Sequence, residues 1–72
     1  MDQATAQREA LQAAHRAWRR ATAAHEAKMA GAAEGRPIGW HEAVREVEEL
    51  ARLHRDFMEK SKPFLRLTSD TP

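Results

Sequence analysis

The 72-residue chain carries 12 basic and 11 acidic residues, so its formal net charge is +1, and alanine supplies half of its hydrophobic positions. Three glycines and three prolines are too few for a turn-rich β-sandwich or barrel. The absence of cysteine excludes disulfides and thiolate metal sites, and no apolar run reaches the roughly 18 residues that a membrane span needs. Alanine, glutamate, arginine and glutamine favour helices, so the composition predicts an all-α protein.

The first predicted helix runs from residue 3 to about residue 33, a stretch without proline and without glycine before Gly31. Asp2 is the expected N-cap, because its carboxylate can accept a hydrogen bond from a free amide of the first turn. Mostly small residues recur along this helix at the spacing of one face. They are Ala4, Leu11, Ala14, Trp18, Ala21, His25 and Ala32, with Ala10, Ala17 and Ala24 beside them.

A loop and a second helix follow. Residues 31–39 contain all three glycines and Pro37, so this segment is predicted to end the first helix. The second helix is predicted over residues 40–61, with Gly39 as N-cap and Glu42 reaching back to a free amide as in a capping box. Pro63 disfavours the helical conformation at the residue before it, and the helix is expected to stop there.

The second helix carries a stripe of larger apolar residues whose positions alternate three and four apart. The stripe comprises Trp40, Ala43, Val47, Leu50, His54, Phe57, Ser61 and Phe64, widened by Val44, Ala51, Leu53 and Met58. The other face is charged and offers three i,i+4 ion pairs, which are Glu48–Arg52, Arg55–Glu59 and Asp56–Lys60. This pattern indicates an amphipathic helix.

The two helices are expected to form an antiparallel hairpin over residues 1–61, in which residue i lies opposite roughly residue 71 − i. Small residues then face large ones, with Ala14 by Phe57, Ala21 by Leu50, Trp18 by Leu53 and His54, and His25 by Val47. Two helices cannot cover both sides of such a wide stripe. We therefore expect association into a four-helix bundle, with a second copy of the chain as the simplest partner and another protein as the alternative.

The expected oligomer or partner interface consists of large residues of both stripes, namely Leu11, Trp18, Val47, Leu50, Leu53, His54 and Phe57. Tryptophan is a frequent interface anchor, so Trp18 either packs within the hairpin or points into the partner. For the histidines on the stripes, His25 and His54, two interpretations stay open. They are half-buried rings among apolar neighbours, or they make the interface sensitive to pH.

The C-terminal tail, residues 62–72, contains three large apolar residues, Phe64, Leu65 and Leu67, which should not remain in water. One interpretation folds them over the open end of the hairpin near Leu11, and the other makes them a docking motif for another protein. The last residues, 68–72, are expected to fray.

The basic stripe, which we define as Arg8, Arg16, Arg19 and Arg20, lies on the predicted solvent face of the first helix. Glu9 is the only acid between residues 8 and 25, so phosphate groups could bind there. However, the net charge of the chain is close to zero, and no aromatic residue on that face could stack on a base. A solvated face is the simpler interpretation, and nucleic-acid binding is the alternative.

The sequence offers no candidate catalytic residue, metal ligand set or cofactor site. No two histidines stand four residues apart, no glycine-rich phosphate loop is present, and neighbouring acids such as Glu48 and Glu49 fall on the solvated face. We therefore expect a small, cytoplasmic, non-catalytic helical protein that acts as a homodimer through protein–protein contacts, as a regulator, inhibitor or adaptor. The competing hypotheses are a nucleic-acid-binding accessory protein and a subunit of a larger helical assembly.

Overall fold

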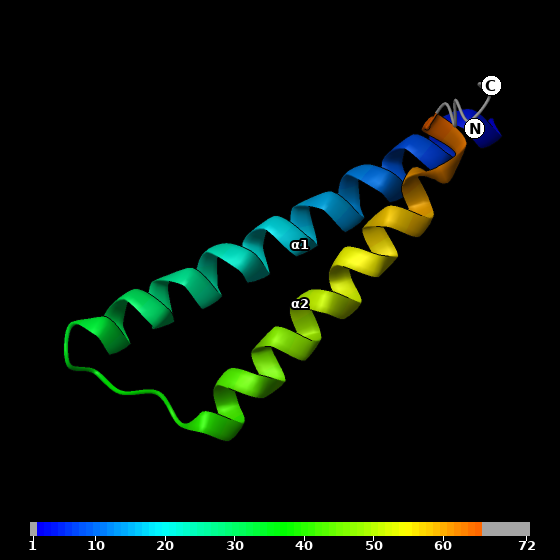
Figure 1. The fold of residues 1–72 in the computed structure, drawn as a ribbon. Helices are drawn as coiled ribbons and strands as arrows, with labels where there is room; N and C mark the ends of the chain where they lie inside the picture. The colour runs from blue at the N-terminus through cyan, green and yellow to red at the C-terminus, as the bar shows by residue number, and fades with distance from the viewer. Residues whose placement is uncertain (1, 66–72) are drawn as a thin grey trace, which may run out of the picture.

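The computed structural model describes residues 2–65, which form an antiparallel helical hairpin (Figure 1). Helix α1 spans Gln3–Ala33, helix α2 spans Trp40–Ser61, and a short 3₁₀ helix, η1, follows at Lys62–Phe64. The all-helical prediction and the predicted boundaries of both helices are confirmed. The reason expected for the end of α2 is wrong, because Lys62, the residue before Pro63, keeps helical backbone angles (φ −50°, ψ −44°) and the chain continues into η1. In this single chain, the four-helix bundle remains a prediction.

Both ends of α1 are capped by local hydrogen bonds. Asp2 is the N-cap, and its Oδ1 accepts from the backbone N–H of Thr5 at 2.7 Å, as predicted. At the other end Gly35 adopts φ +95°, a conformation that side chains disfavour. The N–H of Arg36 then donates to the carbonyl of Gly31 at 2.8 Å, which is the long bond of a Schellman motif. This motif stops α1 and turns the chain into the loop.

The start of α2 differs in one detail from the prediction. Gly39 is the N-cap with extended backbone, but among residues 2–65 no side chain caps the helix. Instead of closing a capping box, Glu42 accepts a hydrogen bond from Lys28 Nζ of α1 at 3.1 Å. A charge-assisted bond to a cation is stronger than one to a neutral amide. Glu42 therefore joins the two helices rather than capping one of them.

The predicted pairing of α1 with α2 is confirmed by contacts along the hairpin. The ring centroids of Trp18 and His54 lie 4.9 Å apart, and His25 donates from Nδ1 to Glu46 Oε1 at 2.8 Å. Both pairs follow the expected relation between residue i and residue 71 − i within about one position. Small residues on α1, such as the buried Ala14, allow the large side chains of α2 to approach.

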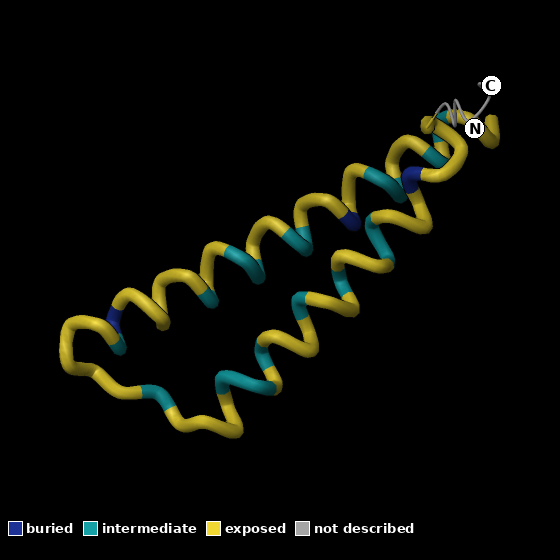
Figure 2. The backbone as a smooth tube through the Cα atoms, viewed as in Figure 1, coloured by how far each residue is buried: buried dark blue, intermediate teal, exposed yellow. Residues whose placement is uncertain are grey.

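The hairpin is a single layer of helices, with overall dimensions of 48 × 35 × 18 Å. Figure 2 shows half-buried positions along the facing sides of α1 and α2, with exposed positions elsewhere. Among the described residues only Ala14, Gly31 and Ser61 are buried, and no large side chain is fully buried. The two helices therefore enclose little core between them over residues 2–65.

Candidate interaction surface

Helix α2 presents two parallel stripes rather than the single wide one that the sequence predicted. The inner stripe faces α1, and all its members are half-buried. It consists of Ala43, Glu46, Leu50, Leu53 and Phe57. Its positions alternate three and four apart, the spacing of one helix face. The inner stripe thus holds the hairpin together.

The outer stripe lies beside the inner stripe on the surface of α2. Its positions also alternate three and four residues apart. It consists of Trp40, Val44, Val47, Ala51, His54 and Met58, and all except Val44 are exposed. Trp40 is 76% exposed, Val47 54% and Met58 44%. Large apolar side chains lined up on one helix face and left in water are typical of a surface that another molecule covers.

The sequence placed Val47 opposite His25, and the structure places Glu46 there instead. The cause is electrostatic, because Glu46 accepts hydrogen bonds from both His25 and Lys28 of α1. Two charge-assisted partners compensate the carboxylate for partial burial. Helix α2 is therefore rotated so that Val47 points outward, which the hydrophobic pattern alone does not reveal.

A groove of about 400 Å³ extends the outer stripe across to α1 near the loop. Met29, 44% exposed, contributes from α1 and lies beside the rings of His25 and Trp40. The α2 wall is formed by Val44 and Val47 of the outer stripe, with Ala43 and Glu48 at its edges. The apolar surface is therefore continuous from one helix to the other.

An aromatic cluster lies farther from the loop, between the two helices. Trp18 of α1 stacks on Phe57 of α2 with a centroid distance of 5.5 Å and an interplanar angle of 15°. The ring centroids of His15 and Phe57 are 5.0 Å apart, and the ring of His54, a residue of the outer stripe, borders Trp18. Trp18 therefore packs within the hairpin, which supports the first of its two interpretations. Thr22, one turn from Trp18, has a buried Oγ1 with no hydrogen-bond partner among residues 2–65.

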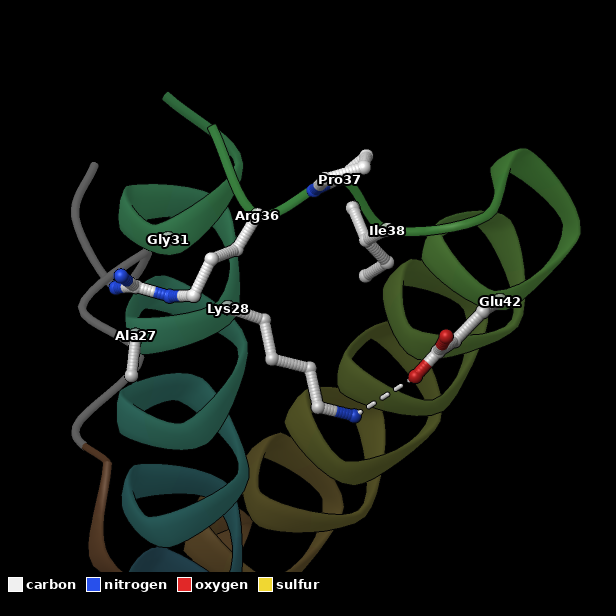
Figure 3. A pocket seen from close by; sticks show the side chains of 7 residues that line it. All are labelled: Ala27, Lys28, Gly31, Arg36, Pro37, Ile38 and Glu42. Carbon is white, nitrogen blue, oxygen red and sulfur yellow. Dashed lines mark hydrogen bonds and ion pairs between the residues drawn. The ribbon is translucent and has the colours of Figure 1, made fainter. Parts of the chain in front are cut away.

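A charged cluster at the loop end lies on the opposite side from the apolar groove. Lys28 bridges Glu42 and Glu46, and the hydrogen bonds from His25 and then Lys28 hold the pKa of Glu46 below its ordinary value. The same carboxylates raise the pKa of Lys28. Figure 3 shows the bridge from Lys28 to Glu42 beside an open hollow of about 400 Å³. The charged side chains of this cluster neutralise one another.

The floor of that hollow is formed by a side chain of the loop. Arg36 lies against Gly31 (Figure 3), where a Cβ atom would come within 3.3 Å of the Arg36 Nε. The guanidinium of Arg36 pairs with Glu34 at 3.0 Å. Gly31 therefore permits the arginine to lie on the helix. Because the cation is engaged by a neighbouring acid, this hollow is best described as part of the loop structure.

The four arginines of the basic stripe are exposed, and none of them forms an ion pair within residues 2–65. Of the three predicted i,i+4 pairs, Asp56–Lys60 forms at 2.5 Å. In the described chain, Arg52 pairs with Glu49 rather than with Glu48, and Glu59 pairs with Lys62 rather than with Arg55. In both cases the predicted partner and the observed partner lie about one helical turn away, so either of them can form the ion pair.

The predicted interface residues fall into two groups. Leu11, Trp18, Leu50, Leu53 and Phe57 are half-buried within the hairpin, whereas Val47 and His54 are exposed on the outer stripe. The sequence did not single out Trp40, Met29 and Met58 as interface residues, although the apolar periodicity contained Trp40 and Met58. In the tail, Phe64 and Leu65 are 43% and 47% exposed, while Leu67 lies outside the described residues.

No group of three or more His, Asp or Glu side chains in residues 2–65 could hold a metal ion. Neither α1 nor α2 is long and apolar enough to cross a membrane. No family model, curated protein or solved structure matches the chain. Function is therefore inferred from the physical character of the surface.

Proposed function

We propose that this chain is a small, non-catalytic helical interaction protein that acts through protein–protein contacts, as a regulator, inhibitor or adaptor, and that it self-associates through the outer stripe into a four-helix bundle. The observation that carries this proposal is the row of exposed large apolar residues, Trp40, Val47 and Met58, on a hairpin that has no fully buried large side chain.

Burial energetics support a second layer. Covering a large apolar side chain contributes roughly 1.5–3 kcal/mol relative to leaving it in water. In the single hairpin, the outer stripe and Met29 supply only part of this burial free energy, because all of these residues except Val44 remain exposed. A second pair of helices laid over this side would complete a two-layer core, as in four-helix bundles.

The spacing of the outer stripe indicates what kind of surface fits it. Positions that alternate three and four apart form a straight seam along a helix, and such a seam packs best against another helix. The seam runs the length of α2, from Trp40 to Met58, and widens across Met29 at the loop end. A helical partner therefore covers it better than an extended peptide or a small ligand.

Sedimentation equilibrium over a range of chain concentrations tests the proposal. We expect a dimer for the native chain, and a shift toward monomer for Val47→Glu, because a charge at this position would have to be desolvated in the interface. Ala23→Glu is the matched control, since Ala23 is exposed on α1 outside the apolar surface. A native chain that remains a cooperatively folded monomer throughout the range would overturn the proposal.

A second candidate function is supported by one specific observation. The basic stripe is exposed and unpaired within the described residues, as a phosphate-binding surface requires. A salt titration of RNA and DNA binding tests it, comparing the native chain with a variant in which Arg16, Arg19 and Arg20 are changed to Gln. Affinity that does not fall with salt, or that survives in the variant, would remove this candidate.

A further inference from the structure

The outer stripe is complementary to a second copy of itself, and we propose that α2 of one chain packs antiparallel on α2 of another, about a two-fold axis that passes near residues 52 and 53. Residue i of one copy then meets roughly residue 105 − i of the other, as the layers of an antiparallel helix pair require. This inference rests on the proposed self-association and specifies its geometry.

The exposed apolar residues of α2 match one another in this register. Val47 of one copy meets Met58 of the other, and Ala51 meets His54. Trp40, the most exposed large apolar residue of the hairpin, lies toward the C-terminal end of the partner's α2, beyond which that chain continues into η1 with Phe64 exposed. A two-fold axis repeats each contact, since residue i touches residue j and residue j touches residue i. Val47 and Met58, two of the large side chains that the single hairpin leaves in water, thereby gain an apolar neighbour.

The charges that border the outer stripe follow the same symmetry. Glu48 and Arg55 stand seven residues apart on its free edge, away from α1, and neither forms an ion pair within residues 2–65. On this edge of an antiparallel helix pair, the facing residues are offset by about two positions from the facing layers of the seam, so Glu48 of one copy faces Arg55 of the other. The axis produces this opposite-charge pair twice. Edge charges of this kind select partner and orientation in paired helices.

Other symmetric arrangements lack these pairs or bring like charges together. If the two α2 helices ran parallel about a two-fold axis, Glu48 and its own copy would lie on opposite sides of the seam, as would Arg55 and its copy, so the Glu48–Arg55 pairs would not form. If instead α1 of one copy lay over α2 of the other with the loops at one end, two like-charge pairs would face each other, Arg16 with Arg55 and Arg19 with Arg52. They would stand beside two opposite-charge pairs, Glu26 with Arg45 and Glu9 with Lys62. Like charges placed directly opposite destabilise helix pairs, so the antiparallel α2 contact is favoured.

Engineered disulfides test this register directly, because the native chain contains no cysteine. The double variant Val47→Cys/Met58→Cys should form a covalent dimer on mild oxidation, and an equimolar mixture of the two single variants should do the same. Each single variant alone should stay uncrosslinked, because its two cysteines would be displaced by about 16 Å along the helix, beyond the roughly 7 Å that a disulfide spans.

The outcomes separate this geometry from self-association itself. If the native chain is a dimer but a single variant crosslinks as efficiently as the double one, α2 pairs in another register and the present inference is wrong. If the native chain is a dimer and no variant crosslinks, the dimer uses another contact, and the inference again fails while the proposed function stands. A monomeric native chain would overturn both.

A charge exchange gives an independent measurement on variants that leave the apolar stripe intact. Glu48→Arg alone and Arg55→Glu alone should each weaken dimerisation roughly tenfold, since two attractive pairs become repulsive. The double exchange Glu48→Arg/Arg55→Glu should restore the native dissociation constant. Arg20→Glu makes the same charge change as Arg55→Glu on a surface away from the outer stripe, and it should leave dimerisation unaffected. Failure of the double exchange to restore affinity would contradict the pairing.

Discussion

The two stripes of α2 differ in a way that reverses the usual expectation for neighbouring residues. Glu46 of the inner stripe has a side chain that is 20% exposed, whereas Val47, the next residue and part of the outer stripe, is mostly exposed. A charged residue is normally found outside and a valine inside. Contacts inside the hairpin therefore explain why the inner stripe of α2 faces α1. They do not explain why the outer stripe, which is left exposed, is apolar.

The inner stripe is orientated by specific partners on α1. Trp18 stacks on Phe57 in the middle of the hairpin, and His25 and Lys28 bind Glu46 near the loop. Apart from His54, whose ring borders Trp18, the outer stripe has no comparable set of contacts within the described chain. Its regular spacing and its apolar character are features that the single hairpin does not use, and this difference is the basis for proposing a second copy.

The largest expected effect comes from removing the aromatic contact of the inner stripe. Trp18→Ala should lower the free energy of unfolding by about 3 kcal/mol, the lower end of the range for large aromatic residues, because Trp18 is only half-buried. Urea unfolding followed by circular dichroism, with both proteins at the same chain concentration, measures this difference. Equal concentrations matter because the stability of a dimer depends on them.

Trp18→Phe is the matched control for that change. A phenylalanine ring can still stack on Phe57, so this variant should lose much less stability than Trp18→Ala. If both variants unfold at the same urea concentration as the native chain, the aromatic cluster contributes little, and the inner stripe would depend on the charged contacts at the loop end instead.

Much of the fold could be predicted from the sequence because its signals are local. Asp2 at the start of α1 and Gly35 in the loop each act within one turn of the chain, so the boundaries of α1 are confirmed. The end of α2 also falls where it was predicted, although Lys62 stays helical and Pro63 lies within η1. The pairing of i with 71 − i follows from a short loop between two helices, and the contacts of Trp18 with His54 agree with it.

The division of α2 into two stripes could not be predicted in the same way. Apolar periodicity treats Val44, Val47 and Leu50 as one surface, because all three fall within the width of a helix face. The rotation of the helix depends on Glu46 finding His25 and Lys28, residues 21 and 18 positions away. Such distant charge pairing is not contained in local spacing, so the exposed site had to be seen in three dimensions.

A smaller effect of opposite sign is expected at Thr22, which borders the inner stripe from α1. Its Oγ1 is buried and has no hydrogen-bond partner among the described residues, and an unsatisfied polar atom of this kind is costly. Thr22→Val keeps the shape of the side chain and a similar helix propensity, so it should raise the free energy of unfolding by about 1 kcal/mol. Thr22→Ser keeps the hydroxyl and should bring no gain. Equal thermal midpoints for the valine variant and the native chain would mean that water satisfies the hydroxyl.

The smallest expected effect concerns Glu46, the charged member of the inner stripe. His25 and Lys28 hold its pKa below the ordinary value of 4.5, so the native state favours the carboxylate. Its contribution to stability is therefore present above about pH 4.5 and is lost as the pH falls through the lowered pKa. Glu46→Gln cannot ionise, and its thermal midpoint should fall less than that of the native chain between about pH 5 and pH 3.

Glu26→Gln, a change at an exposed acid of α1 without an ion pair in residues 2–65, should retain the native acid dependence. If the Gln variant at position 46 also retained it, the carboxylate would not be what turns Glu46 inward, and the rotation that exposes Val47 would need another cause.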